Sequence, residues 1–287
     1  MLPNFLIIGA QKAGTSSLYR YLQGHPQVFV PDLKEPDFFV EERNWSRGIA
    51  WYEALFEGAG DAVAIGEAST SYTMYPMYDG VPARIADLIP RARLVYLVRD
   101  PVERMRSDYL HYRNLRPGAQ RRLRIEREME PLERALISNP HYLHTSRYAL
   151  QIEQYLAHFP RDRLLVITSE DLRHRRLETL RRVFEFVGVD PHRMPSTVDQ
   201  EFNVTDQARL PTAWSRALRR APGYVALAPR VPAAARRVAK RLVTTEVSRE
   251  GAEMPAALRE RLREQLRDDV KRLRPYLGDG FDGWGIA

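Results

Sequence analysis

Four short runs of apolar residues lie along the first two thirds of the chain. They cover residues 5–8, 62–65, 93–98 and 164–167. Each run is too short for a helix and too continuous for a half-exposed strand, a pattern typical of strands buried on both faces of a parallel sheet. We therefore expect four buried strands.

Segments with apolar residues at helical spacing separate these runs and follow the last of them. The clearest begins near Gly14, where Leu18, Tyr21 and Leu22 would share a face. Pro101 can open another helix, because proline is tolerated in the first turn. The spacing predicts helices from about 14, over 45–56, over 83–88, from 101 to about 115, over 146–158 and over 177–187. Strands that alternate with helices predict a three-layer α/β fold with a mainly parallel sheet.

The last quarter of the chain has a different pattern. Residues 209–245 contain nine basic residues and no acidic one, with several prolines and many alanines, and favour a helical arm over a sheet. Residues 256–277 predict a strongly charged amphipathic helix, and an aromatic tail follows it. We expect a single domain over 1–287, with its core at about 4–205, a basic helical arm at about 209–250, and the C-terminal helix and tail at about 255–287.

The basic arm has more than one interpretation. It can be a solvated helical face, or it can attract an anionic acceptor or make peripheral contact with a membrane surface. Nucleic-acid binding is disfavoured, because the segment contains no recognisable module for it. The sequence leaves the oligomeric state open.

Composition indicates a globular protein and excludes several chemistries. The 287 residues include 44 Lys or Arg and 37 Asp or Glu, for a net charge of +7, and 44% are hydrophobic. That content can bury a sizeable core. Because there is no cysteine, disulfides, thiolate nucleophiles and Cys-ligated zinc or iron–sulfur sites are excluded. We recognise neither a signal peptide nor an apolar run of about eighteen residues, and we expect a cytoplasmic protein.

A glycine-rich turn follows the first predicted strand and reads Gly9-Ala-Gln-Lys12-Ala13-Gly14-Thr15-Ser16-Ser17. Such a turn presents free backbone N–H groups and the positive end of a helix dipole, which together bind phosphate or sulfate. A nucleoside triphosphate loop would carry its lysine after the second glycine, where this chain has Thr15. The alternative is an ordinary strand-to-helix turn with a surface lysine.

A second motif follows the third predicted strand, at 99–109. Arg99 emerges where that strand ends, the position at which open α/β sheets bind ligands, and Ser107 lies about two turns into the next helix. A guanidinium fork with a hydroxyl suits a phosphate monoester. The alternative is a structural ion-pair cluster, which we favour for Arg104 and not for Arg99.

A third motif, Lys34-Glu35-Pro36-Asp37-Phe38-Phe39, lies in a loop after the first helix. A carboxylate beside a lysine and two aromatic rings can be a general base in a partly apolar cleft. The same residues can equally be a charged loop without a chemical role.

A fourth motif, Gly66-Glu67-Ala68-Ser69-Thr70-Ser71-Tyr72, is expected directly after the second strand. That place favours a substrate-facing role. Helix capping and turn formation are the alternative, because serine and threonine commonly serve both.

Together and in this order, the motifs resemble the sulfotransferases that use 3′-phosphoadenosine 5′-phosphosulfate (PAPS). The likeness is closest to the heparan sulfate sulfotransferase branch and its bacterial relatives. It rests on residues 7–16, 34–39 and 99–109, and continues more weakly to about residue 205. The first and last of these motifs are specific as a pair.

The resemblance implies a role for each matching residue. Glu35 would be the catalytic base, and Lys12 would be catalytic by reaching the bridging oxygen of the donor. Arg99 and Ser107 would hold the 3′-phosphate, which distinguishes this donor from ATP. The 5′-phosphosulfate would be bound by Lys12, Ala13, Gly14, Thr15 and Ser16. The expected reaction moves a sulfuryl group to a hydroxyl, or alternatively an amine, of a carbohydrate or small metabolite and leaves 3′,5′-ADP, with no metal required.

The chain departs from the family pattern at three places. Eukaryotic heparan sulfate members often have histidine at the position of Asp37 and lysine at that of Ala68. Their late nucleotide-binding loop is basic and contains glycine. Residues 204–207 have neither a basic residue nor a glycine, and Arg209 is a candidate for the missing basic residue. These differences concern the acceptor more than the donor.

Two other functions are compatible with the motifs. One is a nucleotide-dependent kinase on the same scaffold, disfavoured by the position of Lys12 and by the lack of an evident Mg²⁺-holding aspartate after a strand. The other is a non-catalytic anion-binding protein that uses the glycine-rich turn for docking, against which Glu35 and Lys12 argue.

Overall fold

The computed structural model describes residues 1–113, 130–200, 202, 209–211, 244–246 and 253–287. The chain divides into two compact units, Met1–Phe202 with Ala252–Ala287, and Asn203–Gly251. The expectation of a single domain over 1–287 stays a prediction.

The first unit contains a five-stranded parallel sheet in the order β2-β3-β1-β4-β5. Its strands are β1 (Phe5–Gly9), β2 (Val28–Phe29), β3 (Ala64–Ala68), β4 (Arg93–Val98) and β5 (Leu164–Thr168). All four predicted strands are confirmed, although β3 replaces the predicted 62–65. The extra strand β2 has only two residues, too few to give a pattern.

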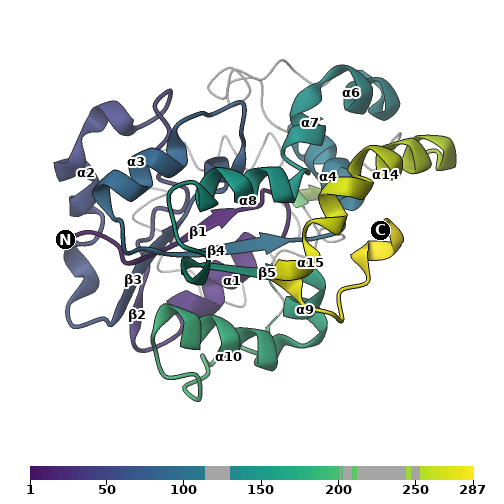
Figure 1. Cartoon of the computed structure of the whole chain (residues 1–287). Helices are drawn as coiled ribbons and strands as arrows, with labels where there is room; N and C mark the ends of the chain where they lie inside the picture. The colour runs from purple at the N-terminus through teal and green to yellow at the C-terminus, as the bar shows by residue number, and fades with distance from the viewer. Residues whose placement is uncertain (114–129, 201, 203–208, 212–243, 247–252) are drawn as a thin grey trace. The chain divides into compact units, whose positions relative to one another are not determined.

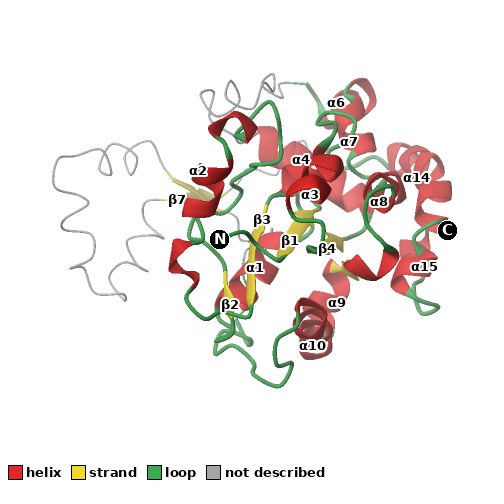
Figure 2. Ribbon diagram, turned by 60° about the vertical axis from the view of Figure 1, so that its left-hand side comes forward, coloured by secondary structure: helices red, strands yellow, loops and turns green. Residues whose placement is uncertain are grey.

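Helices cover both faces of this sheet. Figure 1 shows α3 and α8 on one face and α1 and α10 on the other, and the turned view in Figure 2 has the same two layers. The expected three-layer α/β fold is therefore confirmed. The α-helices are α1 (Thr15–Gln23), α2 (Ile49–Ala54), α3 (Val81–Leu88), α4 (Pro101–Arg113), α6 (Leu132–Ser138), α7 (Pro140–His144), α8 (Tyr148–Leu156), α9 (Ser169–His174), α10 (Arg176–Val187), α14 (Ala256–Lys271) and α15 (Arg274–Leu277). Short 3₁₀ turns are η1 (Trp45–Arg47), η2 (Glu57–Ala59), η3 (Thr70–Thr73), η4 (Arg161–Arg163) and η7 (Gly283–Gly285).

Two predicted helices are interrupted. The helix expected over 45–56 breaks at Gly48, whose φ of 79° lies outside the helical region, so that η1 and α2 are separate. The helix expected over 256–277 divides into α14 and α15, with Pro275 in the first turn of the second.

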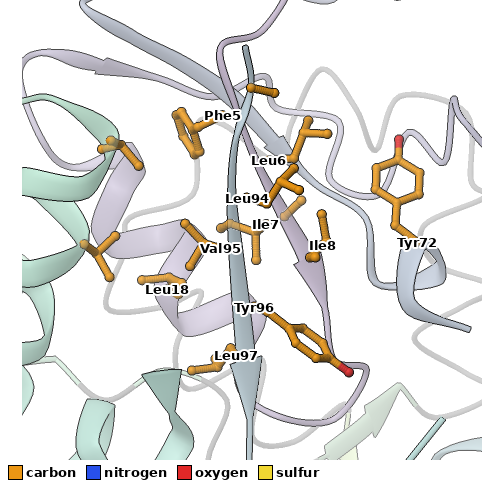
Figure 3. Packing of buried hydrophobic residues seen from close by; sticks show 14 of the residues in the cluster. Phe5, Leu6, Ile7, Ile8, Leu18, Tyr72, Leu94, Val95, Tyr96 and Leu97 are labelled. Atoms are coloured by element: carbon orange, nitrogen blue, oxygen red, sulfur yellow. The ribbon is translucent and has the colours of Figure 1, made fainter. Parts of the chain in front are cut away.

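The core fills both sides of β1 and β4. Figure 3 shows alternate residues of each strand pointing to opposite faces, with Leu18 of α1 on one side and Tyr72 of η3 on the other. The labelled side chains of both strands are almost completely buried. This packing explains why the strands read as continuous apolar runs.

In the second unit the described residues form two short strands. Strand β6 (Arg209–Pro211) pairs antiparallel with β7 (Thr244–Glu246), and Arg209 lies opposite Glu246. The expectation of a helical arm over about 209–250 is therefore wrong at both ends, where backbone pairing between strands replaces a helix. Residues 212–243, which carry most of the basic arm, lie outside the described residues.

Candidate functional site

The carboxyl ends of β1 and β4 are neighbours at the centre of the sheet. Strand β1 pairs with β3 on one side and with β4 on the other. The connections from β1 and β4 lead to opposite sides of the sheet, and in open α/β sheets a ligand-binding crevice is expected outside the strand ends at such a point. The two loops with the sequence motifs begin at this crevice.

The glycine-rich turn between β1 and α1 is the first of these loops. The Ala10 N–H donates to the Leu97 carbonyl over 2.6 Å, which ties the turn to β4. Gly14 precedes α1 in a left-handed conformation with φ 99°, and no side chain caps the helix. The amides of the first turn and the positive end of the helix are therefore directed at the crevice, as an anion site requires.

Lys12 stands in this turn with a φ of 68°, which is rare for a residue other than glycine. Burial lowers the pKa of its ammonium, and Arg99 acts in the same direction. The Asp108 and Glu35 carboxylates raise that pKa. Lys12 is therefore within electrostatic reach of Arg99 and of the Glu35 and Asp108 carboxylates.

Arg99 follows β4 and lies against the turn. Its guanidinium donates to the Lys12 carbonyl over 3.2 Å. Ser107 lies two turns along α4, is only 5% exposed, and its hydroxyl has no hydrogen-bond partner among the described residues. A buried unpartnered hydroxyl is costly without a ligand, so Ser107 fits a site for a bound anion.

Arg104 has the structural role that we favoured. Its guanidinium is fully buried, pairs with Asp108 over 2.9 Å and donates to Ser146, Thr145 and the Tyr142 carbonyl. Asp100, in turn, accepts from the N–H groups of Val102 and Glu103 and so caps α4.

Glu35 lies in the loop that faces the turn. Its side chain is 43% exposed and pairs with Lys34 over 2.7 Å. This exposure differs from the partly apolar cleft, one of the two interpretations that the sequence left open. The Thr70 hydroxyl donates to the Glu35 carboxylate over 3.4 Å, and the Glu35 N–H donates to the Ala68 carbonyl over 2.9 Å.

Comparison with known proteins decides the family. The family model described as the sulfotransferase domain matches residues 2–207. The chain belongs to the sulfotransferase domain family.

Relatives and solved structures agree with this assignment. The chain is 31% identical over 208 residues to the bifunctional heparan sulfate N-deacetylase/N-sulfotransferase 4 of Mus musculus, a match that covers 67% of this chain and 23% of that protein. It is 32% identical over 190 residues to the heparan sulfate glucosamine 3-O-sulfotransferase 3A1 of Mus musculus, which covers 66% of this chain and 46% of that protein. The chain thus spans about a quarter to a half of these relatives. The crystal structure of a sulfotransferase from Alicyclobacillus acidocaldarius has a TM-score of 0.68 at 26% identity and covers 99% of both chains.

From the sequence, His111 was missed and Glu67 was misplaced. His111 lies one turn beyond Ser107 on α4, and its pKa is lowered by burial and by Lys12 and raised by Asp108 and Glu35. The four-residue spacing from Ser107 was the available signal. Glu67 was expected in a substrate-facing loop after the second strand, but it lies within β3 and is 0% exposed.

Other predicted features are placed as follows. His141 and His144 lie in the short helix α7, and burial lowers the pKa of His141 to about 4. Residues 204–207 lie outside the described residues, and nothing is described of the Arg209 side chain. Within the described part of the chain, no group of three or more His, Asp or Glu is placed to hold a metal. No described helix is long and apolar enough to cross a bilayer.

Proposed function

We propose that this sulfotransferase-family chain transfers a sulfuryl group from PAPS to an acceptor hydroxyl or amine and leaves 3′,5′-ADP. The observation that carries the proposal is the buried hydroxyl of Ser107, which has no hydrogen-bond partner among the described residues and lies on the helix that begins beside Arg99. It supports a second anion site besides the glycine-rich turn. A donor with both a 5′-phosphosulfate and a 3′-phosphate needs two such sites, whereas ATP needs only one.

The residues of the turn would bind the 5′ end of the donor. Amides of the first turn of α1 and the hydroxyls of Thr15 and Ser16 donate hydrogen bonds to anionic oxygens. Lys12 adds a positive charge where the phosphate leaves. Because burial lowers the pKa of Lys12, its ammonium can also give a proton more readily than an exposed lysine.

Glu35 would act on the acceptor. Its carboxylate takes the proton from the acceptor hydroxyl or amine while the acceptor atom bonds to sulfur. The bond between sulfur and the bridging phosphate oxygen breaks, and Lys12 neutralises the charge that develops on that oxygen. By analogy with phosphoryl transfer, the in-line step depends mainly on positioning and charge stabilisation.

A carbohydrate is the acceptor class that we propose. The relatives in both groups are named for heparan sulfate, one group for N-sulfation and the other for 3-O-sulfation. Because both acceptor atoms occur among relatives of similar identity, the proposal includes a hydroxyl and an amine.

Transfer of radioactive sulfate from PAPS to a desulfated heparan sulfate oligosaccharide tests this proposal. We expect transfer by the wild-type protein and a loss of about a hundredfold or more in Glu35→Gln, because general-base catalysis contributes roughly that factor. Glu42→Gln, which changes an exposed carboxylate in the same segment, is the matched control and should retain activity. Full turnover in Glu35→Gln would remove Glu35 as the base, and absence of transfer by the wild type would exclude this oligosaccharide as the acceptor.

A further inference from the structure

Glu67 is a fully buried carboxylate in the middle of the first unit. It lies in β3 and accepts hydrogen bonds from three hydroxyl groups. Tyr72 and Tyr52 donate to Oε1 over 2.7 and 3.2 Å, and Ser69 donates to Oε2 over 2.8 Å. No ion pair with a cation is present for this carboxylate among the described residues.

Packing alone does not explain an acid at this position. A buried carboxylate is costly even when hydrogen-bonded, and an apolar residue of similar volume would be at least as stable there. Burial raises the pKa of Glu67 to about 7, which reflects this cost. We therefore expect the carboxylate to have an effect on neighbouring residues that an apolar side chain would not have.

The Glu67 carboxylate determines the direction in which the Ser69 hydroxyl points its proton. A serine hydroxyl has one proton to donate and two lone pairs that accept. Ser69 gives its proton to Glu67, which leaves its oxygen to accept the backbone N–H of Asp37 over 3.0 Å. Glu67, Ser69 and Asp37 thus form a continuous chain of hydrogen bonds from β3 to the loop that contains Glu35.

The loop needs such support because its backbone is strained. Glu35 and Asp37 have φ values of 60° and 49°, both in the left-handed region. Residues other than glycine remain in that region only where their surroundings hold them. The Glu35 N–H bond to the Ala68 carbonyl and the bonds from Arg43 and Ser71 to the Asp37 carboxylate complete the attachment.

We propose that Glu67, acting through Ser69, is a positioning residue that holds Glu35 at the transfer site. The proposal rests on the proposed function of Glu35 as the base. Glu67 touches neither donor nor acceptor. It orients Ser69, Ser69 fixes the backbone at Asp37, and that backbone fixes the direction of the Glu35 side chain.

Four variants separate positioning from general stability. Ser69→Ala removes the acceptor for the Asp37 N–H, and Ser69→Thr keeps it at a residue whose backbone is extended and suits a β-branched side chain. Glu67→Gln leaves Ser69 without its carboxylate acceptor. Tyr52→Phe is the matched control, because it removes a hydroxyl donor from Glu67 without touching Ser69 and keeps the ring that stacks on Phe38.

Two measurements are made on each full-length variant. The first is amide hydrogen exchange of the peptide that covers 33–39. The second compares kcat for sulfate transfer to the desulfated oligosaccharide with the Kd for 3′,5′-ADP. For Ser69→Ala we expect exchange about tenfold faster in this peptide, and kcat lower by about tenfold or more with Kd changed less than about twofold. Glu67→Gln should change in the same direction, and Ser69→Thr and Tyr52→Phe should resemble the wild type.

The outcomes distinguish this inference from the proposed function. Unchanged exchange and unchanged kcat in Ser69→Ala, with Glu35→Gln inactive, would overturn the positioning role and leave Glu35 as the base. Equal loss of kcat and of 3′,5′-ADP binding would overturn it too, because a general structural defect affects both. Faster exchange in Ser69→Ala together with full activity in Glu35→Gln would instead contradict the proposed role of Glu35.

Discussion

Left-handed backbone at residues other than glycine is concentrated at the proposed site. Among the described residues it occurs at Lys12, Glu35, Asp37 and Trp284, with φ between 49° and 68°. Each such residue costs roughly 1–3 kcal/mol and persists because its surroundings determine it. Three of the four lie in the two loops to which we assign donor binding and proton transfer. At the scale of single residues, the protein therefore stores strain where the geometry of the reaction has to be fixed.

Glu67 should make stability depend on pH. Burial raises its pKa from 4.5 to about 7, although hydroxyl donors act in the opposite direction. Below pH 4.5 the Glu67 carboxyl is protonated in both the folded and the unfolded chain, so its contribution to the stability of the fold is largest there. As pH rises to about 7 the unfolded chain loses its proton first, and the free energy of unfolding should fall by about 3 kcal/mol. Above that pH the contribution is constant.

Urea unfolding at pH 5 and pH 8 measures this effect. From pH 5 to pH 8 the wild type should lose stability through ionisation of Glu67, whereas Glu67→Gln should not, because its amide does not ionise. The free energy of unfolding of Glu67→Gln should therefore rise relative to that of the wild type. The comparison cancels the other carboxylates, which titrate in both proteins. Parallel pH profiles of the two proteins would contradict the raised pKa.

Residue roles could be read from the sequence only where a motif fixed them. A structural ion-pair role was predicted for Arg104, and the structure confirms it with Asp108 as the partner. Glu67 was misjudged because the predicted strand ended at residue 65, which placed the acid in a loop. The predicted strand ended three residues too early, and this error was enough to place a buried residue in an exposed loop.

At the scale of elements, the C-terminal helix α14 stabilises the start of α8. Asp269 of α14 accepts from the backbone N–H groups of Ala149 and Leu150 over 3.0 and 3.1 Å. Helix α8 has no side-chain cap from its own N-cap residue, Arg147. A cap from a segment more than a hundred residues away therefore replaces a local one. It joins the C-terminal segment to the core that carries the site.

Removal of this cap should cost stability. We expect Asp269→Ala to lower the free energy of unfolding by about 1–2 kcal/mol, the usual effect of losing an N-cap, with a larger loss if the amides stay buried. Asp268→Ala is the control, because that side chain is 96% exposed. Urea unfolding of both variants is the measurement, and equal stability of the two would show that the cap contributes nothing.

Elements with strong patterns were predictable, and short ones were not. The four apolar runs and the main amphipathic helices were found because burial on both faces or on one stripe leaves a clear period. Helices α6, α7 and α9 have seven, five and six residues, which is at most two turns. At that length tertiary contacts rather than the local pattern decide the structure.

At the scale of the whole molecule, the order of the strands brings together the two loops to which we assign anion binding. Strands β1 and β4 are neighbours although more than eighty residues separate them. The sequence predicted a parallel sheet but could not give the strand order, because the apolar residues of a buried parallel strand do not indicate which strand lies beside it. The net charge of +7 favours association with anionic ligands such as the proposed donor.

Calorimetric titration with 3′,5′-ADP in the absence of Mg²⁺ tests the central claim most directly, with 5′-ADP and ATP as comparison ligands. We predict tight binding that requires the 3′-phosphate and weakens by about tenfold or more in Arg99→Ala and Ser107→Ala, the effect of a lost charge-assisted hydrogen bond. Ser107→Ala should leave the stability of the free protein unchanged or raised, because it removes a buried hydroxyl for which the described part of the chain provides no partner. Equal binding of ATP, or binding that requires Mg²⁺, would contradict the use of PAPS and favour a kinase.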